Sequence, residues 1–146
     1  MSAIEIRQPS FAELPGIIRL RYMVLDAPRE LPFDPVIRDE DKDPQTIHMA
    51  AFDGSSPVST LRIERHIDYG PYVRRMATAE QYLRRGLGRK VLEQAASLAF
   101  EAGVTQLTLH SRPGSEEFYE RCGFMPTGEY NEDDYGKYPK MVRAIR

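Results

Sequence analysis

Two glycines separated by one residue, Gly86 and Gly88, stand directly before an apolar stretch with helical spacing. Glycine has no Cβ, so this part of the backbone can turn tightly and approach another group closely. The helix that follows directs unpaired N–H groups and a partial positive charge back at the turn. Cationic residues flank the turn on both sides: Arg84, Arg85, Arg89 and Lys90. This combination predicts a site for an anion with several phosphoryl oxygens.

The glycine turn also has a simpler interpretation, in which the chain only changes direction before a helix. It is not a P-loop, because no Gly-Lys-Ser/Thr follows at the required spacing. It does not match the dinucleotide-binding fingerprint either, because Val91 stands where the third glycine would fall. The phosphate interpretation therefore depends on the segments on either side of the turn.

Composition limits the class of protein. The 146 residues suffice for one domain with a core, and we expect a single domain over residues 1–146. With 41% apolar and 29% charged residues, a folded chain is expected. The net charge of −2 argues against general nucleic-acid binding, which needs many cations.

The sequence predicts a cytoplasmic location without a membrane partner. It shows no cationic-then-apolar leader, and no apolar run approaches the roughly 20 residues that span a bilayer. Cys122 is the only cysteine, so an internal disulfide is excluded. We expect this thiol to pack as a small side chain, because no histidine partner for a nucleophile is evident. No spacing of His, Cys and Asp is typical of zinc, and His48 and His110 lie far apart, so no metal is expected.

Hydrophobic periodicity predicts the order β-α-loop-β-β-β-α-β-α-β-β. The expected strands are 4–7, 46–52, 58–66, 69–78, 104–109, 124–130 and 137–145, and the expected helices are 10–25, 87–102 and 115–121. This order predicts an α/β fold with a mixed, mostly antiparallel sheet flanked by helices. One strand-helix-strand crossover contains the glycine turn.

Several details refine this order. Ser10 and Glu13 form a capping box that begins the first helix. The proline-rich and acidic residues 27–44 read as a long irregular loop, a type that is often functional. In the second helix one face is expected to be buried, formed by Leu87, Val91, Ala95, Leu98 and Ala102. A polar loop around 131–134 is expected to join the last two strands.

Three segments together resemble the GNAT superfamily of acyl-CoA-dependent N-acyltransferases. They are Arg-Met-Ala-Thr at 75–78, Arg-Arg-Gly-Leu-Gly at 84–88 and Phe-Tyr-Glu-Arg-Cys-Gly-Phe at 118–124. The resemblance extends from about Ile4 to Arg146 through the element order, and it is strongest between residues 74 and 125. Two positions depart from the family pattern: Leu83 replaces a Gln or Arg, and Arg112 stands where many members carry Asn.

The resemblance implies a GNAT-like fold in which two splayed strands hold CoA. Amide N–H groups at the glycine turn would hold the pyrophosphate, and the strand before it would pair with the pantetheine arm. This strand would separate from the next one, around Leu107 to His110, and free an N–H to polarise the thioester carbonyl. The residues that the resemblance assigns to acetyl-CoA, the acyl donor, are Met76, Ala77, Thr78, Arg84, Arg85, Gly86, Leu87, Gly88, Arg89, Lys90 and Arg112.

Tyr119 is the expected general acid. A phenol with a pKa of about 10 stays protonated at neutral pH, whereas a thiol of the CoA kind has a pKa near 8.5. Tyr119 can therefore donate a hydrogen bond or a proton to the departing thiolate. In the alternative interpretation, Phe118 and Tyr119 only anchor a short helix.

A base must take a proton from the acceptor, because an alkylammonium with a pKa near 10 has no free lone pair at pH 7. Candidates are Glu64, His66 and Glu80, of which Glu64 and His66 share one face of their strand. Each is also compatible with a solvated surface residue, and a water relay is an alternative. The acidic runs 39–43 and 132–134 either attract a cationic amine or are solvated. Tyr130, Tyr135 and Tyr138 either line the acceptor cleft or cover the sheet.

The sequence thus predicts an N-acetyltransferase that moves an acetyl group from acetyl-CoA to a primary amine by direct attack in a ternary complex. The acceptor is a small molecule or a peptide, and a homodimer is compatible with the sequence. One alternative is a non-catalytic acyl-CoA-binding sensor or interaction module of the same fold, for which the replacement at Leu83 is the motive. A nucleic-acid-binding domain is a third interpretation, and the net negative charge speaks against it.

Overall fold

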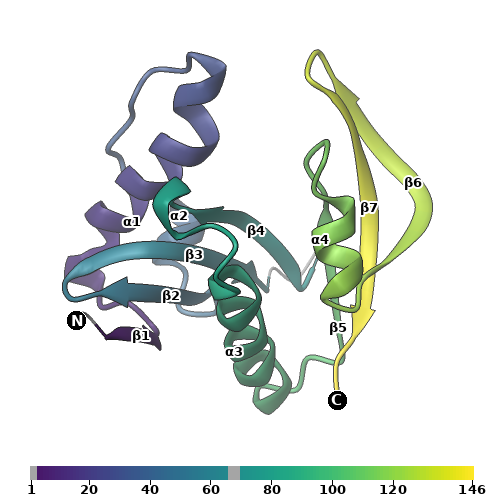
Figure 1. Ribbon diagram of the computed structural model, residues 1–146. Coiled ribbons are helices and arrows are strands. Elements are labelled where there is room, and N and C mark those ends of the chain that lie inside the picture. The colour runs from purple at the N-terminus through teal and green to yellow at the C-terminus, as the bar shows by residue number, and fades with distance from the viewer. Residues whose placement is uncertain (1–2, 66–69) are drawn as a thin grey trace.

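The computed structural model describes residues 3–65 and 70–146, and there the chain forms one mixed sheet (Figure 1). The sheet order is β1-β2-β3-β4-β5-β7-β6, and all neighbours are antiparallel except β4 and β5. The strands are β1 (Ile4–Arg7), β2 (Ile47–Asp53), β3 (Ser56–Glu64), β4 (Tyr72–Thr78), β5 (Gln106–His110), β6 (Met125–Asp133) and β7 (Gly136–Ala144). The predicted mixed, mostly antiparallel sheet is confirmed.

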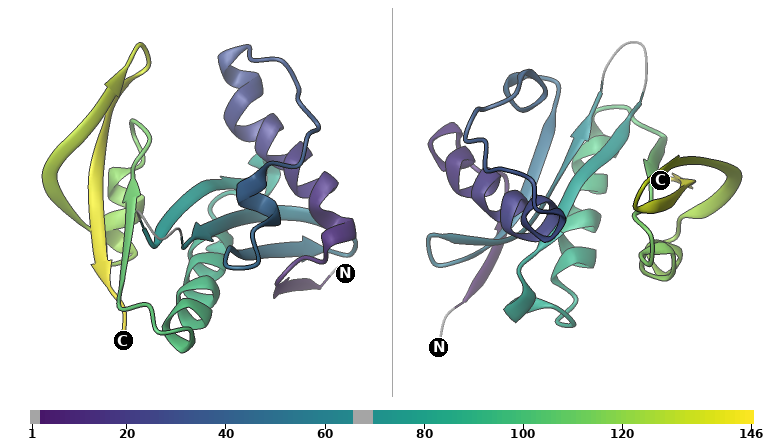
Figure 2. Two further views of the ribbon diagram at one scale, coloured as in Figure 1. Left: turned by 180° about the vertical axis from the view of Figure 1, so that it is seen from behind. Right: turned by 90° about the horizontal axis from the view of Figure 1, so that it is seen from above.

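Helices cover both faces of the β1–β4 half of this sheet (Figure 2). On one face α1 (Leu14–Arg21) continues into a π-helical turn, η2 (Tyr22–Asp26). On the other face α3 (Leu87–Glu101) packs against β2 and β3. The shorter helical elements are η1 (Phe11–Glu13), η3 (Ala27–Arg29), α2 (Asp39–Lys42), η4 (Glu80–Tyr82) and α4 (Glu116–Arg121). Among the described residues no helix has the length and apolar character needed to cross a membrane.

Local chemistry explains how the first helix begins. The N–H of Ser10 donates to the Glu13 carboxylate over 2.8 Å, which confirms the predicted capping box. Both Nη atoms of Arg7 also donate to this carboxylate, each over 2.8 Å. These hydrogen bonds, first that of Arg7, lower the pKa of Glu13 to about 2.

Three predictions of detail need correction. Residues 27–44 are not wholly irregular, because η3 and α2 lie within them. Ala102 is exposed, because the helix ends at Glu101 and its buried face is completed by Leu92, Ala96 and Ala99. Residues 131–133 belong to β6 rather than to a loop, and the turn lies at 134–135. The whole of β6 is exposed, so its sequence lacks the alternation that marks a half-buried strand.

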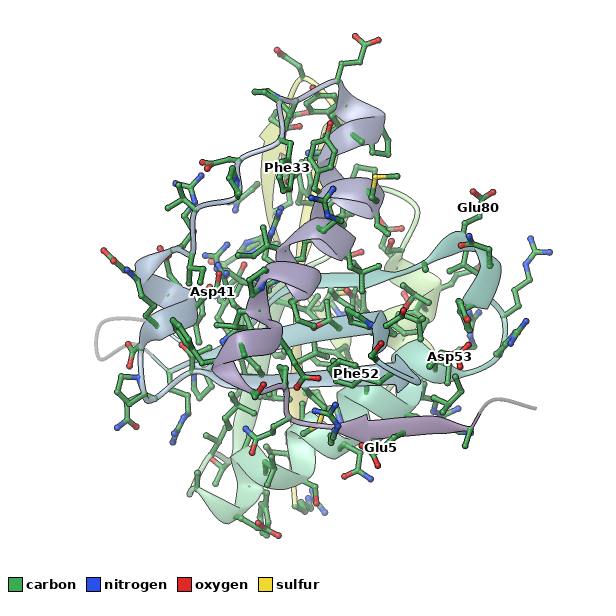
Figure 3. All side chains as sticks on the ribbon, turned by 90° about the vertical axis from the view of Figure 1, so that its left-hand side faces the viewer. Glu5, Phe33, Asp41, Phe52, Asp53 and Glu80 are labelled. Atoms are coloured by element: carbon green, nitrogen blue, oxygen red, sulfur yellow. The ribbon has the colours of Figure 1, made fainter. Side chains whose placement is uncertain are left out.

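A buried group of charges ties α1 and α2 to the sheet. The Asp41 carboxylate accepts hydrogen bonds from Nη1 of Arg21 and from Nη1 of Arg62, each over 2.9 Å. Nε of Arg62 donates to Glu64 over 2.7 Å, and all four side chains are buried. Burial raises the pKa of Asp41, but the charges of Arg21 and Arg62 outweigh this and hold the pKa below its usual range. Figure 3 shows Asp41 next to the helices that cover the sheet.

Replacing Asp41 by Asn should lower the free energy of unfolding by about 3–5 kcal/mol, because the buried guanidinium of Arg21 loses its counter-charge and that of Arg62 keeps only Glu64. Urea denaturation measures this difference. Asp39→Asn is the matched control, because Asp39 lies on the same short helix with its side chain exposed. The control should change stability by no more than about 0.5 kcal/mol.

The same interaction has a pH signature with a defined sign. Because the pKa of Asp41 is lower in the folded state, its contribution is present above the unfolded value of 3.8 and is lost as pH falls below it. Wild-type stability should therefore fall more steeply below pH 4 than that of Asp41→Asn. Equal slopes for the two proteins would contradict this account of Asp41.

Candidate active site

β4 and β5 separate soon after they begin. Their register contains one pair, Tyr72 with Thr108, and the N–H of Thr108 donates to the carbonyl of Pro71 over 3.1 Å. Beyond this pair β4 continues along β3, whereas β5 continues along β7 (Figure 1). The predicted splay is confirmed. The side of β4 that faces β5 is therefore open from Val73 to Thr78.

A bulge lies in the open part of β4. Arg75 and Met76 both stand opposite Leu61, and Arg75 has a left-handed φ of 55°. Bulges re-aim a strand and are frequent beside active sites. Beyond the bulge, Ala79 donates its N–H to the Val58 carbonyl over 2.8 Å. By the antiparallel alternation, the backbone groups of Thr78 then point to the open side.

The glycine turn presents free amide groups at the start of α3. The N–H of Lys90 donates to the Gly86 carbonyl over 3.1 Å, which is the first hydrogen bond of the helix. The preceding N–H groups, those of residues 84–89, form no hydrogen bond with the described part of the chain. Gly86 has a φ of 75°, which an L-residue rarely adopts, and a Cβ there would meet nothing within 4 Å. Gly86 is therefore needed for its conformation.

Gly88 has a different role, which is close packing. A Cβ at this position would lie 3.1 Å from Cε of Met76 and 3.4 Å from Oγ1 of Thr78. It would also lie 3.4 Å from the ring of Phe118. The absence of a side chain thus lets the first turn of α3 rest directly on β4 and α4. As a result the free amides lie beside the open side of β4.

Two cavities meet at this place. The loop cavity, of about 770 Å³, lies between the glycine turn, β4 and α4. The hairpin cavity, of about 520 Å³, lies between β4, β5 and the β6–β7 hairpin. Four residues line both of them: Leu25, Met76, Arg112 and Tyr119. A group that crosses from one cavity to the other therefore passes Tyr119.

Tyr119 projects from α4 and is held by aromatic contacts. Its ring packs edge-on against Phe118 and Phe124, with centroids 5.2 and 5.8 Å away. Its hydroxyl donates to Sδ of Met76 over 3.6 Å. Burial raises the pKa of Tyr119 to about 12, so the phenol is protonated at neutral pH.

The loop cavity brings together most of the residues expected to bind the cofactor. Its lining includes Met76, Ala77, Thr78, Arg84, Gly86, Leu87, Gly88, Arg89 and Arg112. Arg85 and Lys90 are not part of the lining. The guanidinium of Arg85 lies over the ring of Tyr82 at 5.0 Å, and Lys90 is exposed on α3.

Two of the expected bases lie elsewhere. Glu64 is buried and accepts a hydrogen bond from Arg62, with Nε of Arg74 3.3 Å away, and it lines neither cavity. Its carboxylate is engaged with two guanidinium groups. Glu80 lies on η4 outside both cavities, and Figure 3 shows it pointing outward at the edge of the molecule. His66 lies outside the described residues.

His110 lines the site although it is not among the bases expected from the sequence. It ends β5, lines the hairpin cavity and stacks on the ring of Tyr72 with centroids 5.6 Å apart. Its Nδ1 is buried and has no hydrogen-bond partner among the described residues. Burial lowers the pKa of His110, and the charge of Lys140 adds to this. The sequence signal was its place at the carboxyl end of a strand that separates from its neighbour.

The structure shows which of the tyrosines and acidic residues expected near the acceptor line a cavity. Tyr138 lines the hairpin cavity, whereas Tyr130 and Tyr135 are exposed. Of the acidic runs, 132–133 line that cavity, and Asp41 belongs to the buried charge group.

Cys122 is buried, and burial raises the pKa of its thiol, which fits a packing role. In residues 3–65 and 70–146 no group of three His, Cys, Asp or Glu side chains could hold a metal ion.

Known proteins share this sequence pattern and this fold. Residues 34–144 match the family described as "Acetyltransferase (GNAT) domain". An uncharacterized acetyltransferase of Streptococcus pyogenes is 31% identical over 109 residues, which is 73% of each chain.

Two solved structures superpose over nearly the whole chain. A provisionally assigned N-acetyltransferase of Lactobacillus plantarum has a TM-score of 0.82, 25% identity and 99% coverage of both chains. An aminoglycoside 6′-N-acetyltransferase complexed with coenzyme A has a TM-score of 0.80, 14% identity and 97% coverage of both chains. On the family match and the curated relative, the chain belongs to the GNAT family of acetyltransferases.

Proposed function

We propose that this protein transfers an acetyl group from acetyl-CoA to a primary amine by direct attack in a ternary complex. The observation that carries the proposal is the open side of β4, which runs from the free amides of the glycine turn to Tyr119. A donor that is anionic at one end and extended in the middle matches this arrangement. The donor would lie in the loop cavity and the amine in the hairpin cavity.

The residues of the loop cavity fit the donor group by group. Six consecutive free N–H groups, at 84–89, suit the pyrophosphate at a helix N-terminus. Arg84, Arg89 and Arg121 also line this cavity and add positive charge. The backbone groups of Thr78 on the open side of β4 suit the amides of a pantetheine arm. A structure of a related fold, the aminoglycoside acetyltransferase, contains coenzyme A.

Tyr119 would stabilise the leaving thiolate. Its pKa of about 12 lies above the value of about 8.5 for a thiol of this kind, so full proton transfer to the thiolate is uphill. A hydrogen bond donated by the phenol to sulfur does not have this cost. We therefore infer that Tyr119 acts mainly as a hydrogen-bond donor to the sulfur as the C–S bond breaks.

His110 would accept the proton that the amine loses. The acceptor attacks as the neutral amine: its nitrogen forms the new bond to the acetyl carbon, the C–S bond breaks to release the thiolate, and the nitrogen gives up one proton to leave an amide. Because the pKa of His110 is lowered, the imidazole is neutral at pH 7 and one ring nitrogen is free to accept a proton. It lines the same cavity as Tyr119, which Glu64 and Glu80 do not.

Tyr119→Phe should reduce thiol release from acetyl-CoA roughly 10²-fold or more, with little change in KM for acetyl-CoA. The reason is the loss of one hydrogen bond that forms only as thiolate charge develops. A thiol-release assay over a panel of primary amines measures the effect. Tyr130→Phe is the control, because Tyr130 is 52% exposed on β6 and lines neither cavity.

This assay also separates the enzyme from the sensor alternative. Acetyl-CoA binding without thiol release for any amine of the panel would favour a sensor. Unchanged turnover in Tyr119→Phe would instead leave this tyrosine as an anchor of α4.

His110→Gln should lower kcat/KM roughly 10²-fold. It should also remove the fall of kcat/KM at acidic pH that we expect in the wild type. In the wild type, activity should fall as pH drops through the pKa of His110, which lies below 6.5, because the protonated imidazole cannot accept a proton. His48→Gln is the control: the pKa of His48 is also lowered by burial, but it lies outside both cavities. A fall of kcat/KM at acidic pH that persists in His110→Gln would show that another group is the base.

A further inference from the structure

Four arginines that come from three separate segments of the chain line the hairpin cavity. They are Arg29 of η3, Arg74 and Arg75 of β4, and Arg112, which follows β5. Nε of Arg74 lies 3.3 Å from the carboxylate of Glu64. The Asp26 carboxylate is engaged by Arg75, whose Nη1 and Nη2 lie 3.2 and 2.8 Å from its two oxygens. Each of the two β4 arginines is thus paired with a carboxylate.

The other two arginines are held by neutral groups. Nη2 of Arg29 donates to the hydroxyl of Tyr138 over 2.7 Å, and its guanidinium lies 4.1 Å from the centre of the Tyr135 ring. Nη2 of Arg112 donates to the backbone carbonyl of Leu25 over 3.2 Å. Such contacts orient a guanidinium, but they bring no negative charge to it.

The two positive charges are close enough to act on each other. Burial lowers the pKa of Arg112, and the charge of Arg29 lowers it further. The carboxylates that line the hairpin cavity are those of Glu132 and Asp133, on the exposed strand β6. Neither is hydrogen-bonded to Arg29 or Arg112 in the described part of the chain. An anion placed between these two arginines would relieve their repulsion.

The position of this charge separates it from the phosphates of a CoA donor. Arg29 lines the hairpin cavity and not the loop cavity. Arg112 lines both and stands at the junction beside Tyr119. An anion bound by this pair is therefore on the side of the acceptor.

We propose that the acceptor is an amine that also carries an anionic group, a carboxylate or a phosphate, bound by Arg29 and Arg112. The inference rests on the proposed function, because it names the class of acceptor for the same site. Guanidinium groups bind both anions through paired N–H donors. Held in this way, the acceptor has its other end, the amine, within the cavity that His110 and Tyr119 line.

The test compares matched amines that differ in the anionic group. The carboxylate pairs are phenylalanine with phenethylamine and β-alanine with ethylamine, and the phosphate pair is O-phosphoethanolamine with ethanolamine. Isothermal titration into protein saturated with CoA measures binding independently of turnover. We expect the anionic member of at least one type of pair to bind about tenfold or more tightly than its neutral partner. Comparison of the two types shows which anion is preferred.

Variants then locate the preference. Arg29→Met and Arg112→Met should each reduce it severalfold or abolish it, and Arg29→Lys should retain part of it, because it keeps the charge without the fork. Arg19→Met is the control, because Arg19 is exposed on α1 outside both cavities. Circular dichroism checks that each variant is folded.

The outcomes distinguish this inference from the proposed function. Tighter binding of anionic amines that is abolished in Arg29→Met supports the anionic acceptor. If such binding is found but no thiol is released with any amine, the proposed function fails and the anionic-ligand site remains. Equal or tighter binding of the neutral amines overturns the inference. The inference is also overturned if no amine binds at millimolar concentration, or if the preference for anionic amines survives in both Arg29→Met and Arg112→Met.

Discussion

Backbone hydrogen bonds that β4 does not make on one side are the constraint on which the site depends. β4 pairs with β3 along its length but with β5 only at Tyr72. Backbone N–H and C=O groups need partners, so the open side of a strand inside a sheet must meet water or a ligand. The bulge at Arg75 and the close packing of Gly88 place this side beside the free amides of the glycine turn. A strand-like ligand with an anionic end would satisfy both sets of groups.

Arginine serves two purposes in this fold, and the partners of each residue distinguish them. Arg21 and Arg62 share the buried carboxylate of Asp41, so their charges are compensated and they bind α1 and α2 to the sheet. Arg29 and Arg112 are held by a phenol, a ring and a carbonyl, none of which compensates charge. In the first arrangement the loss of one partner would leave a buried charge unpaired, whereas the second leaves charge available to a ligand.

The sequence predicted the elements that are buried on one face and the separation of β4 from β5 beside the glycine turn. The helix after the glycine turn, the strands of the sheet and the splay of β4 from β5 follow from apolar spacing, glycine chemistry and the family resemblance. The contacts of individual side chains could not be predicted from the sequence. Glu64 is engaged by Arg62 and Arg74, and His110 meets Tyr72 from a distant part of the chain. The β6–β7 hairpin is longer than predicted. The sequence did not indicate its full length, because β6 buries neither face and so has no apolar alternation.

Titration of acetyl-CoA into wild type, Gly86→Ala and Gly103→Ala tests whether the amides of the glycine turn bind the donor. Both glycines flank α3, have positive φ values of 75° and 93°, and would have nothing within 4 Å of an added Cβ, so both substitutions impose similar strain. We expect the wild type to bind acetyl-CoA and Gly86→Ala to bind it roughly tenfold more weakly, because the amides at 84–89 lose their arrangement. Gly103→Ala should bind acetyl-CoA like the wild type. No binding of the wild type at millimolar acetyl-CoA, or equal affinity of the two variants, would contradict the proposed role of the glycine turn.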